Sequence, residues 1–455
     1  MNRKQRRARE KNKKTVTGKL SNNDYAALGA MAYKQGDIQR ALEFFAKAVT
    51  ADPKNHDYKV RLAHVLKNIR FESFNPKLKE LVMICLNEEG LDYQDLSQAW
   101  HSLIQCDPAF QGWLRESLND PFLLEGLKKI TVYDTGFENL LLRLREESSN
   151  AAFNAAFDTY CARVEHVFSD TPKDIPAPEI DESIVSLGST DDDVSQKVRS
   201  HYEENPYPRW SSIHVQAAPK PNLGKTHNHL IAGCGTGFGL CGTAMLYPNA
   251  KITAIDLSRA SLSYAKNKAW VLGLKNISFY QADILNLDAL DGMFDVVECS
   301  GVLHHMDDPV AGWRCLLQKL QPDGRMHIGL YSEIGRRDVV AAREIVKEQG
   351  FKPDHAGIKA AREYINALPD DHAAKAVTTR RDFYSLSDCR DLIFHAQEHR
   401  FTIPKIQSAL NELGLKFEAF DHHPKRFDTL DEWHGYEQEN PNAFKGMYQF
   451  WCSRR

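Results

Sequence analysis

The chain has 455 residues, of which 42% are hydrophobic and 26% charged, and its formal net charge is -3. This length predicts two to three domains of about 100–200 residues, and the composition is typical of a water-soluble globular protein rather than a disordered or fibrous one. No stretch approaches the roughly 20 apolar residues of a membrane span. The charged N-terminus has no apolar segment behind it, so we expect no secretory signal either. The nine cysteines are an odd number without metal-ligand spacing, which favours reduced thiols and a cytoplasmic location.

Residues 1–20 form a strongly basic tail, in which nine lysines and arginines stand against the single Glu10. Such a tail could contact RNA, a ribosome or an anionic membrane surface. The alternative is a solvated, disordered tail that aids solubility. Because no aromatic side chain is interleaved for base stacking, we favour the alternative over nucleic-acid contact.

Residues 21–168 predict an all-α domain. The pattern over 22–55 resembles one tetratricopeptide unit, in which Gly29 and Ala41 let two helices approach while Leu28 and Phe45 fill the seam. Residues 56–89 keep only a degraded form of this pattern, so the solenoid is short or is completed by other helices. Amphipathic patterning continues over 94–168, and the expected core residues there are Trp100, Leu103, Phe110, Trp113, Leu114, Phe137, Leu140, Leu141 and Leu144. A purely structural module and a peptide-docking groove both fit this region.

The proline-containing and acidic segment 169–193 predicts a linker, and 194–455 a second domain. In that domain the apolar run 229–232 is followed by the glycine-rich segment 233–239 and a helix-compatible stretch, which indicates a strand, a turn and a helix start. Glycines there allow backbone N–H groups to approach a ligand closely. Asp256 ends the next β-like run, at about the twenty-residue spacing at which a carboxylate reaches ribose hydroxyls. Together these features predict a nucleotide site.

The order of elements after this motif resembles the class I, Rossmann-like S-adenosylmethionine (SAM)-dependent methyltransferases over about 225–335. The strand 294–299 leads into Leu303, His304 and His305, and a further strand follows at 326–331. The resemblance resumes in a helix at 403–414 and strands at 415–420 and 447–452, which look like the antiparallel hairpin of that family. It implies an α/β fold with a seven-stranded sheet and this C-terminal hairpin, preceded by the tetratricopeptide-like all-α domain. A helical insertion is expected at about 333–402.

The resemblance implies that the cofactor is SAM and assigns residues to its parts. The glycine turn would wrap the methionine portion through Gly233, Cys234, Gly235 and Gly237. The carboxylate of Asp256 would hold the ribose, next to Leu257, and that of Asp283 would accept from the adenine amino group, next to Ile284. The floor beneath the sulfonium would be lined by Cys299, Ser300 and Gly301.

Two observations leave alternatives open at this site. Family members usually carry an acidic residue two positions before the first glycine, where this chain has Ile231, so the way in which the amino-acid end of SAM is held stays open. Residues 237–242 also match the dinucleotide-binding pattern GxGxxG. That match begins beyond the strand end, and its glycines would lie inside the following helix, so we favour SAM.

Methyl transfer needs an acceptor held in line with the methyl group and, if the acceptor must lose a proton, a group that takes that proton up. His304 and His305 follow the fourth strand and could supply a general base, although we expect one of them to pack or orient. Tyr207 belongs to the proline-stiffened segment 202–210, which we expect to form a lid over the cofactor. The alternative is that the aromatic side chains of this segment only pack one domain against the other. His395 and His399 would lie one helical turn apart, a spacing that can bind zinc, but no third ligand is evident and we expect no metal.

The arginines of the insertion suggest an acidic acceptor or a salt-bridged helical cap. The predicted function is a SAM-dependent methyltransferase that acts on a protein, a peptide or a small molecule, with the helical region recruiting the substrate or a partner. The alternative is a non-enzymatic adaptor with a degenerate cofactor domain. Because one fold serves many acceptors, the acceptor is not predicted.

Overall fold

The computed structural model describes residues 22–67, 69–110, 115–131, 133–164, 179–190, 192–204, 206–208, 210, 213, 226–395, 397–421, 423, 425–444 and 446–455. The predicted basic tail 1–20 lies outside the described residues, as do Trp113, Leu114 and residues 169–178 of the predicted linker. Contacts divide the chain into two units, of which the first runs to residue 132 and again over 137–160, and the second comprises 133–136 and the chain from 161 on.

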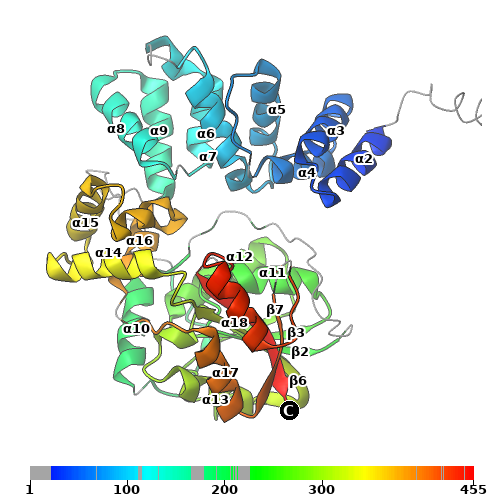
Figure 1. Ribbon diagram of the computed structural model, residues 1–455, viewed down its shortest axis with the longest axis vertical. Coiled ribbons are helices and arrows are strands. Elements are labelled where there is room, and N and C mark those ends of the chain that lie inside the picture. Colours follow the sequence, from blue (N-terminus) through cyan, green and yellow to red (C-terminus); the bar gives the residue numbers. More distant parts are fainter. Residues whose placement is uncertain are drawn as a thin grey trace, which may run out of the picture. The chain divides into compact units, whose positions relative to one another are not determined.

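The described part of the first unit is helical (Figure 1). Gly29 and Phe45 bring its first two helices together, because a β-carbon at Gly29 would lie 3.0 Å from the Phe45 ring. The predicted core residues are buried, except that Leu140 is half-buried and Trp113 and Leu114 are not described. The hairpin agrees with the predicted unit, but its assignment as a tetratricopeptide repeat rests on the sequence pattern alone. The helices are α2 (Asn22–Lys34), α3 (Ile38–Ala51), α4 (His56–Leu66), α5 (Pro76–Leu86), η1 (Tyr93–Leu96), α6 (Ser97–Cys106), η2 (Arg115–Asn119), α7 (Pro121–Lys129), α8 (Thr135–Glu147) and α9 (Ala151–Val164).

The second unit contains an eight-stranded sheet in the order β1-β4-β3-β2-β5-β6-β8-β7. All neighbouring strands are parallel except β8, which is antiparallel to both β6 and β7. This confirms the Rossmann-like fold with its C-terminal antiparallel hairpin. The strands are β1 (Val185–Leu187), β2 (Asn228–Ala232), β3 (Lys251–Asp256), β4 (Ile277–Ala282), β5 (Phe294–Ser300), β6 (Leu320–Tyr331), β7 (Leu415–Phe420) and β8 (Met447–Arg454).

Strand β1 lies within the predicted linker and adds an eighth strand to the seven expected. It pairs with β4 at the edge of the sheet, from Val185 to Leu187. Its side chains are exposed or half-buried, so the segment has none of the apolar alternation that marks a strand in a sequence. Backbone hydrogen bonds to β4, which no local pattern reveals, make this segment a strand.

Helices cover both faces of the sheet. On one face, α13 (Pro309–Gln318), α17 (Ile403–Glu412) and α18 (Leu430–Glu439) pack on a large apolar core that includes Trp313 and Trp433. On the other face, α11 (Phe238–Leu246) and α12 (Arg259–Val271) pack on a smaller core, and the second unit also contains α10 (Asp193–Glu204) and η3 (Leu303–His305). No helix among the described residues is long and apolar enough to cross a membrane.

The predicted insertion forms a helical subdomain with an apolar core of its own. It contains α14 (Arg337–Glu348), α15 (His355–Ala367), η4 (Ala373–Thr379), η5 (Arg381–Phe383) and α16 (Leu386–Phe394). After it the chain returns to the sheet, where the Phe401 N–H donates to the Tyr331 carbonyl at 2.8 Å and the His399 N–H to the His304 carbonyl at 2.7 Å.

The expectation that His395 and His399 share one helical face is wrong. Helix α16 ends at Phe394, and His395 leaves it with a ψ of 137°. The N–H groups of His399 and Phe401 donate to the distant carbonyls of His304 and Tyr331 instead of to carbonyls four residues before them, so long-range pairing overrides the local helical pattern.

Gly126 of α7 offers a test of the packing in the first unit. A β-carbon there would lie 2.0–2.4 Å from atoms of the Trp100 indole, which is fully buried and donates to the Phe122 carbonyl at 2.8 Å. We expect Gly126→Ala to lower the free energy of unfolding by about 1–3 kcal/mol through overpacking. Thermal unfolding followed by circular dichroism measures this.

The matched control is Gly435→Ala in α18, where the added methyl group would meet nothing within 4 Å. This variant should be neutral or more stable by up to about 1 kcal/mol, because alanine loses less backbone entropy in a helix. An unfolding temperature of Gly126→Ala equal to that of the wild type would contradict the packing described for Trp100.

Candidate functional site

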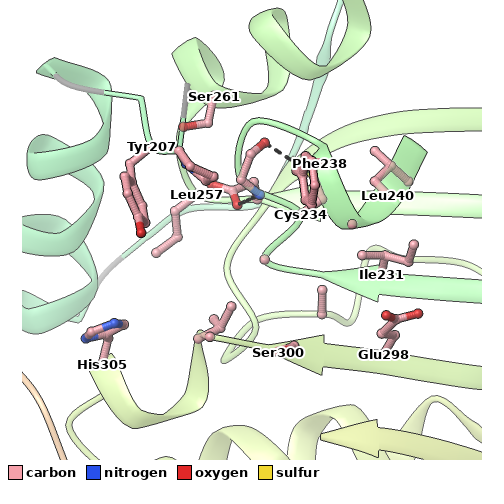
Figure 2. Close-up of a pocket in the computed structure, with 18 of the residues that line it drawn as sticks. Tyr207, Ile231, Cys234, Phe238, Leu240, Leu257, Ser261, Glu298, Ser300 and His305 are labelled. Atoms are coloured by element: carbon pink, nitrogen blue, oxygen red, sulfur yellow. Dashed lines mark hydrogen bonds between the residues drawn. The ribbon is translucent and has the colours of Figure 1, made fainter. Parts of the chain in front are cut away.

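A cavity of about 680 Å³ opens at the carboxyl ends of β2, β3 and β5, the position at which doubly wound sheets bind ligands. Its volume is typical of a small-molecule site. Figure 2 shows Tyr207 and His305 at one end, Ile231 and Glu298 at the other, and Cys234 and Leu257 between them.

The turn from β2 to α11 requires glycine. Gly233, Gly235 and Gly237 have φ values of 72°, 52° and 84°, which are unfavourable for other residues. A β-carbon at Gly233 would lie 2.2 Å from the Val302 side chain, and one at Gly237 would lie 2.7 Å from the Ala265 β-carbon. The turn therefore forms part of the cavity wall with its backbone. Its N–H groups bond within the protein: Gly233 donates to the Ile255 carbonyl, Gly235 to Asp256 and Gly237 to the Cys234 carbonyl. Gly239 and Gly242 lie inside α11, so they cannot form the turn of a dinucleotide site.

Asp256 ends β3 directly beside this turn. One carboxylate oxygen accepts from the Gly235 N–H at 2.8 Å and the other from the Ser258 N–H at 2.9 Å. Burial raises the pKa of Asp256 to about 6, although both of these hydrogen bonds favour the ionised form. Leu257 lines the cavity next to it. A buried carboxylate is thus held at the cavity wall, close to the glycine turn.

The strand ends that follow supply most of the other predicted residues. Asp283 and Ile284, after β4, line the cavity together with Ser300 and Gly301, after β5. Cys299 does not line it, and its predicted place there is wrong. Side chains alternate along a strand, so Glu298 and Ser300 face the cavity while Cys299 is buried in the core on the opposite face.

The structure separates the two neighbouring histidines. His305 lines the cavity, and its Nδ1 donates to the Gln397 carbonyl at 2.7 Å, which leaves Nε2 unprotonated in the neutral ring. His304 is fully buried, stacks on the Tyr331 ring at 3.8 Å between centroids, and does not line the cavity. Burial lowers the pKa of both well below the usual value. His305 is therefore the candidate base, whereas His304 is a packing and orienting residue that lies against Tyr331.

Tyr207 also lines the cavity, and burial raises the pKa of its phenol well above the usual value. Its segment is tied to the glycine turn, because the Thr236 hydroxyl donates to the Pro208 carbonyl and the Trp210 indole donates to the Thr236 carbonyl at 3.0 Å. Asn205 and Arg209 of the same segment lie outside the described residues. The described residues of this segment thus pack on the side of the cavity that the glycine turn forms.

Glu298, His327 and Asp421 are among the cavity residues that were not predicted. His327 Nδ1 lies 3.5 Å from Glu298 Oε1, and its Nε2 lies 3.3 Å from Asp421 Oδ2. His229 Nε2 lies 3.2 Å from Glu298 Oε2. The sequence signal was present, because these are charged or titratable side chains at inward positions of otherwise apolar strands. Their contacts could not be predicted because they join residues of β2, β5, β6 and the end of β7, which only the folded sheet brings together.

Charge pairing sets the protonation of this cluster. Burial alone would lower the pKa of His327, but hydrogen bonding and charge from Asp421 and Glu298 outweigh it and raise the pKa to about 9. Burial alone would raise the pKa of Glu298, but hydrogen bonds with His229 and His327 hold it well below the usual value. The His327 imidazolium and the Glu298 carboxylate are therefore both charged at neutral pH.

Several arginines of the insertion are paired with carboxylates of the protein, as expected for a salt-bridged cap. Arg336 binds Glu398 at 2.7 Å, Arg343 binds the same carboxylate at 3.0 Å, and Arg380 binds Asp338 at 2.6 Å.

We expect the stability of the protein to depend on His327 in a specific pH window. Because the folded pKa of about 9 lies above the ordinary 6.5, the contribution of His327 is complete below pH 6.5 and is lost as the pH rises through about 9. Urea unfolding should show His327→Gln to be less stable than the wild type by about 3 kcal/mol near pH 6, with the difference shrinking as the pH approaches 9. The exposed His372→Gln serves as the control and should lack this pH dependence. A wild-type advantage that instead grows with pH would contradict the pairing.

Comparison with known proteins agrees with this geometry. Residues 225–386 match the family model described as a methyltransferase domain. The protein "Uncharacterized protein syc1184_c" from Synechococcus sp. (strain ATCC 27144 / PCC 6301 / SAUG 1402/1) is 30% identical over 288 residues, which cover 54% of this chain and 68% of the relative. Malonyl-[acyl-carrier protein] O-methyltransferase from Bacillus anthracis is 34% identical over 137 residues, which cover 30% of this chain and 44% of that protein.

Among solved structures, PKMT2 from Rickettsia typhi in complex with AdoHcy is 17% identical, with a TM-score of 0.43, over 52% of this chain and 50% of that chain. This chain thus spans about half the length of that structure and less than half of the named O-methyltransferase. The residues that the family model matches, 225–386, include the glycine turn and Asp256, which favours an enzyme over the non-enzymatic adaptor. The chain belongs to the class I, Rossmann-like methyltransferases, and its cofactor is S-adenosylmethionine.

Proposed function

We propose that this enzyme methylates an oxygen or nitrogen nucleophile that still carries its proton and lies between Tyr207 and His305. The observation that carries this proposal is the hydrogen bond from His305 Nδ1 to the Gln397 carbonyl, at 2.7 Å. It leaves the Nε2 lone pair as the only proton-accepting atom of that ring, in a side chain that lines the cavity. A nucleophile that had already lost its proton would need no such base.

SAM supplies an electrophilic methyl group on a sulfonium. The nucleophile's lone pair forms the new bond to the methyl carbon as the carbon–sulfur bond breaks, and His305 Nε2 takes up the proton that the nucleophile releases. The low pKa of His305 makes it a weak base, so it takes this proton late, once the nucleophile has become positively charged. The proton then passes to solvent.

We propose for the cofactor side the roles that the family resemblance implies. The backbone of Gly233, Gly235 and Gly237 would wrap the methionine portion, Asp256 would bind the ribose, and Asp283 the adenine. The positive φ values of the three glycines and the buried carboxylate beside them support this. Ser300 and Gly301 line the same cavity and would lie beneath the sulfonium.

We further propose that the acceptor group belongs to a protein or peptide that the helical unit recruits, with a small molecule as the alternative. Helical hairpins are a common scaffold for peptide docking. The α2–α3 hairpin exposes large apolar side chains at Met31, Tyr33 and Ile38, of which Met31 is 58% exposed. The O-methyltransferase among the relatives fits an oxygen nucleophile. A cytoplasmic location fits the nine cysteines of the chain, for which no disulfide is found.

The role of Asp256 predicts a defect in cofactor binding. Calorimetric titration with SAM at neutral pH should show that Asp256→Ala weakens binding by about 10- to 100-fold, because charged hydrogen bonds to the ribose are lost. For the wild type, affinity should fall as the pH drops through about 6, where Asp256 gains a proton. Asp307→Ala, at an exposed carboxylate outside the cavity, is the control. Equal SAM affinity in the wild type and both variants would show that Asp256 does not bind the cofactor.

The acceptor is tested with SAM that carries a labelled methyl group, incubated with the full chain and with protein and metabolite fractions of the cells that produce it. We expect the label on protein, in an oxygen- or nitrogen-linked methyl group. His305→Gln should slow labelling by about 100-fold or more without weakening SAM binding, whereas His372→Gln should not slow it. Label confined to metabolites would favour the small-molecule alternative.

The helical unit is tested in the same assay with Met31→Glu, which should reduce labelling of protein but leave SAM affinity unchanged. Gln35→Glu, which adds the same charge at another exposed position after α2, is its matched control. Equal labelling by the two variants would contradict a recruiting role for the exposed apolar side chains.

A further inference from the structure

Two helices of the second unit bring three metal-binding side chains together beside the cavity. His201 comes from the last turn of α10, and Asp391 and His395 come from the last turn and the end of α16. One ligand atom from each of the three lies within 4.8 Å of the other two. We propose that His201, Asp391 and His395 bind one divalent transition-metal ion of the zinc type.

The backbone places these residues in a suitable arrangement. Asp391 and His395 are four residues apart, so their side chains lie on one face of α16. His201 faces them from α10, with its Nε2 3.9 Å from Asp391 Oδ1 and its ring centroid 5.0 Å from that of His395. A zinc ion with bonds of about 2.0–2.2 Å to nitrogen and oxygen fits after small side-chain movements that draw the three ligand atoms together.

The charge balance of the cluster favours a cation. Asp391 is 6% exposed, and its only hydrogen bond among the described residues comes from the Tyr202 hydroxyl at 2.8 Å. No lysine or arginine in the described part of the chain lies within ion-pairing distance of it. A buried carboxylate with one neutral partner is unfavourable, and burial accordingly raises its pKa. A bound divalent ion would compensate this charge.

Metals bind an imidazole through an unprotonated ring nitrogen. His395 Nε2 points at the Tyr202 hydroxyl, 3.4 Å away, while its Nδ1 accepts the Gln397 N–H at 3.2 Å. Binding through Nε2 moves the ring proton to Nδ1, and the Gln397 N–H must then turn to another acceptor.

The ligand atoms and their position indicate which metal ions the site can bind. Two nitrogens and one oxygen suit zinc and similar ions rather than magnesium or calcium, which prefer oxygen ligands. Three protein ligands leave the fourth position of a tetrahedral zinc ion open. Asp391 and Tyr202 both line the cavity, so the ion would lie at its wall. This inference does not depend on the class of the methyl acceptor.

The test is a calorimetric titration of the metal-free full chain with zinc sulfate, and with magnesium chloride as the contrasting ion. We expect one tight zinc ion per chain and no magnesium. His201→Gln, Asp391→Asn and His395→Gln should each weaken zinc binding by at least about 100-fold. Tyr202→Phe, which removes only the hydroxyl partner of Asp391, should weaken it by about 10- to 100-fold. Near-ultraviolet circular dichroism shows whether each variant keeps its fold.

His399→Gln is the matched control, because the sequence pattern pairs His395 with His399 whereas the structure pairs it with His201. It should bind zinc like the wild type. Cobalt bound in place of zinc should lack a sulfur charge-transfer band, which excludes a site made by cysteines. The proposal is overturned if the wild type binds no stoichiometric zinc, or if His399→Gln loses the ion while folded His201→Gln keeps it. SAM titration of the wild type tests the cofactor site separately.

Discussion

The second unit depends on one backbone constraint, the left-handed glycine turn between β2 and α11. The Gly233 and Cys234 N–H groups both donate to the Ile255 carbonyl, at 2.8 and 3.0 Å, which fixes the turn to the end of β3. The Gly235 N–H donates to Asp256, so the same turn positions the carboxylate. A side chain at Gly233 would collide with Val302 after β5. Three strand ends thus approach one another closely because the glycines of the turn carry no side chains, and the cavity opens beside them.

Around that point the protein keeps polar groups buried by pairing them across strands. His327 lies between the carboxylates of Glu298 and Asp421, and His305 is oriented by a backbone carbonyl from the insertion. Each arrangement joins segments that are far apart in the sequence. Charged and neutral histidines therefore coexist within one cavity, because their partners differ: carboxylates hold His327 protonated, whereas burial without a carboxylate keeps His305 neutral.

The insertion 333–402 is a subdomain with an apolar core of its own. Arg336 and Arg380 are bound to Glu398 and Asp338. The insertion contributes Asp391 to the cavity wall and the Gln397 carbonyl to His305. The glycine turn and Asp256, in contrast, belong to the strand ends.

The sequence by itself determined the parts of this protein that depend on local spacing. The glycines of the turn, Asp256, the order of strands β2 to β8 and the helical first unit follow from short-range patterns, since backbone conformation and apolar periodicity are properties of neighbouring residues. Only the tertiary structure decided the features that depend on long-range contact. Strand β1 forms by pairing with β4, and helix α16 ends because the following residues bond to the sheet unit. Cys299 turns away from the cavity while Glu298 faces it, His305 rather than His304 reaches the cavity, and His395 meets His201 instead of His399. In each case the deciding partner lies tens to hundreds of residues away, or on the other face of a strand, where no local pattern records it.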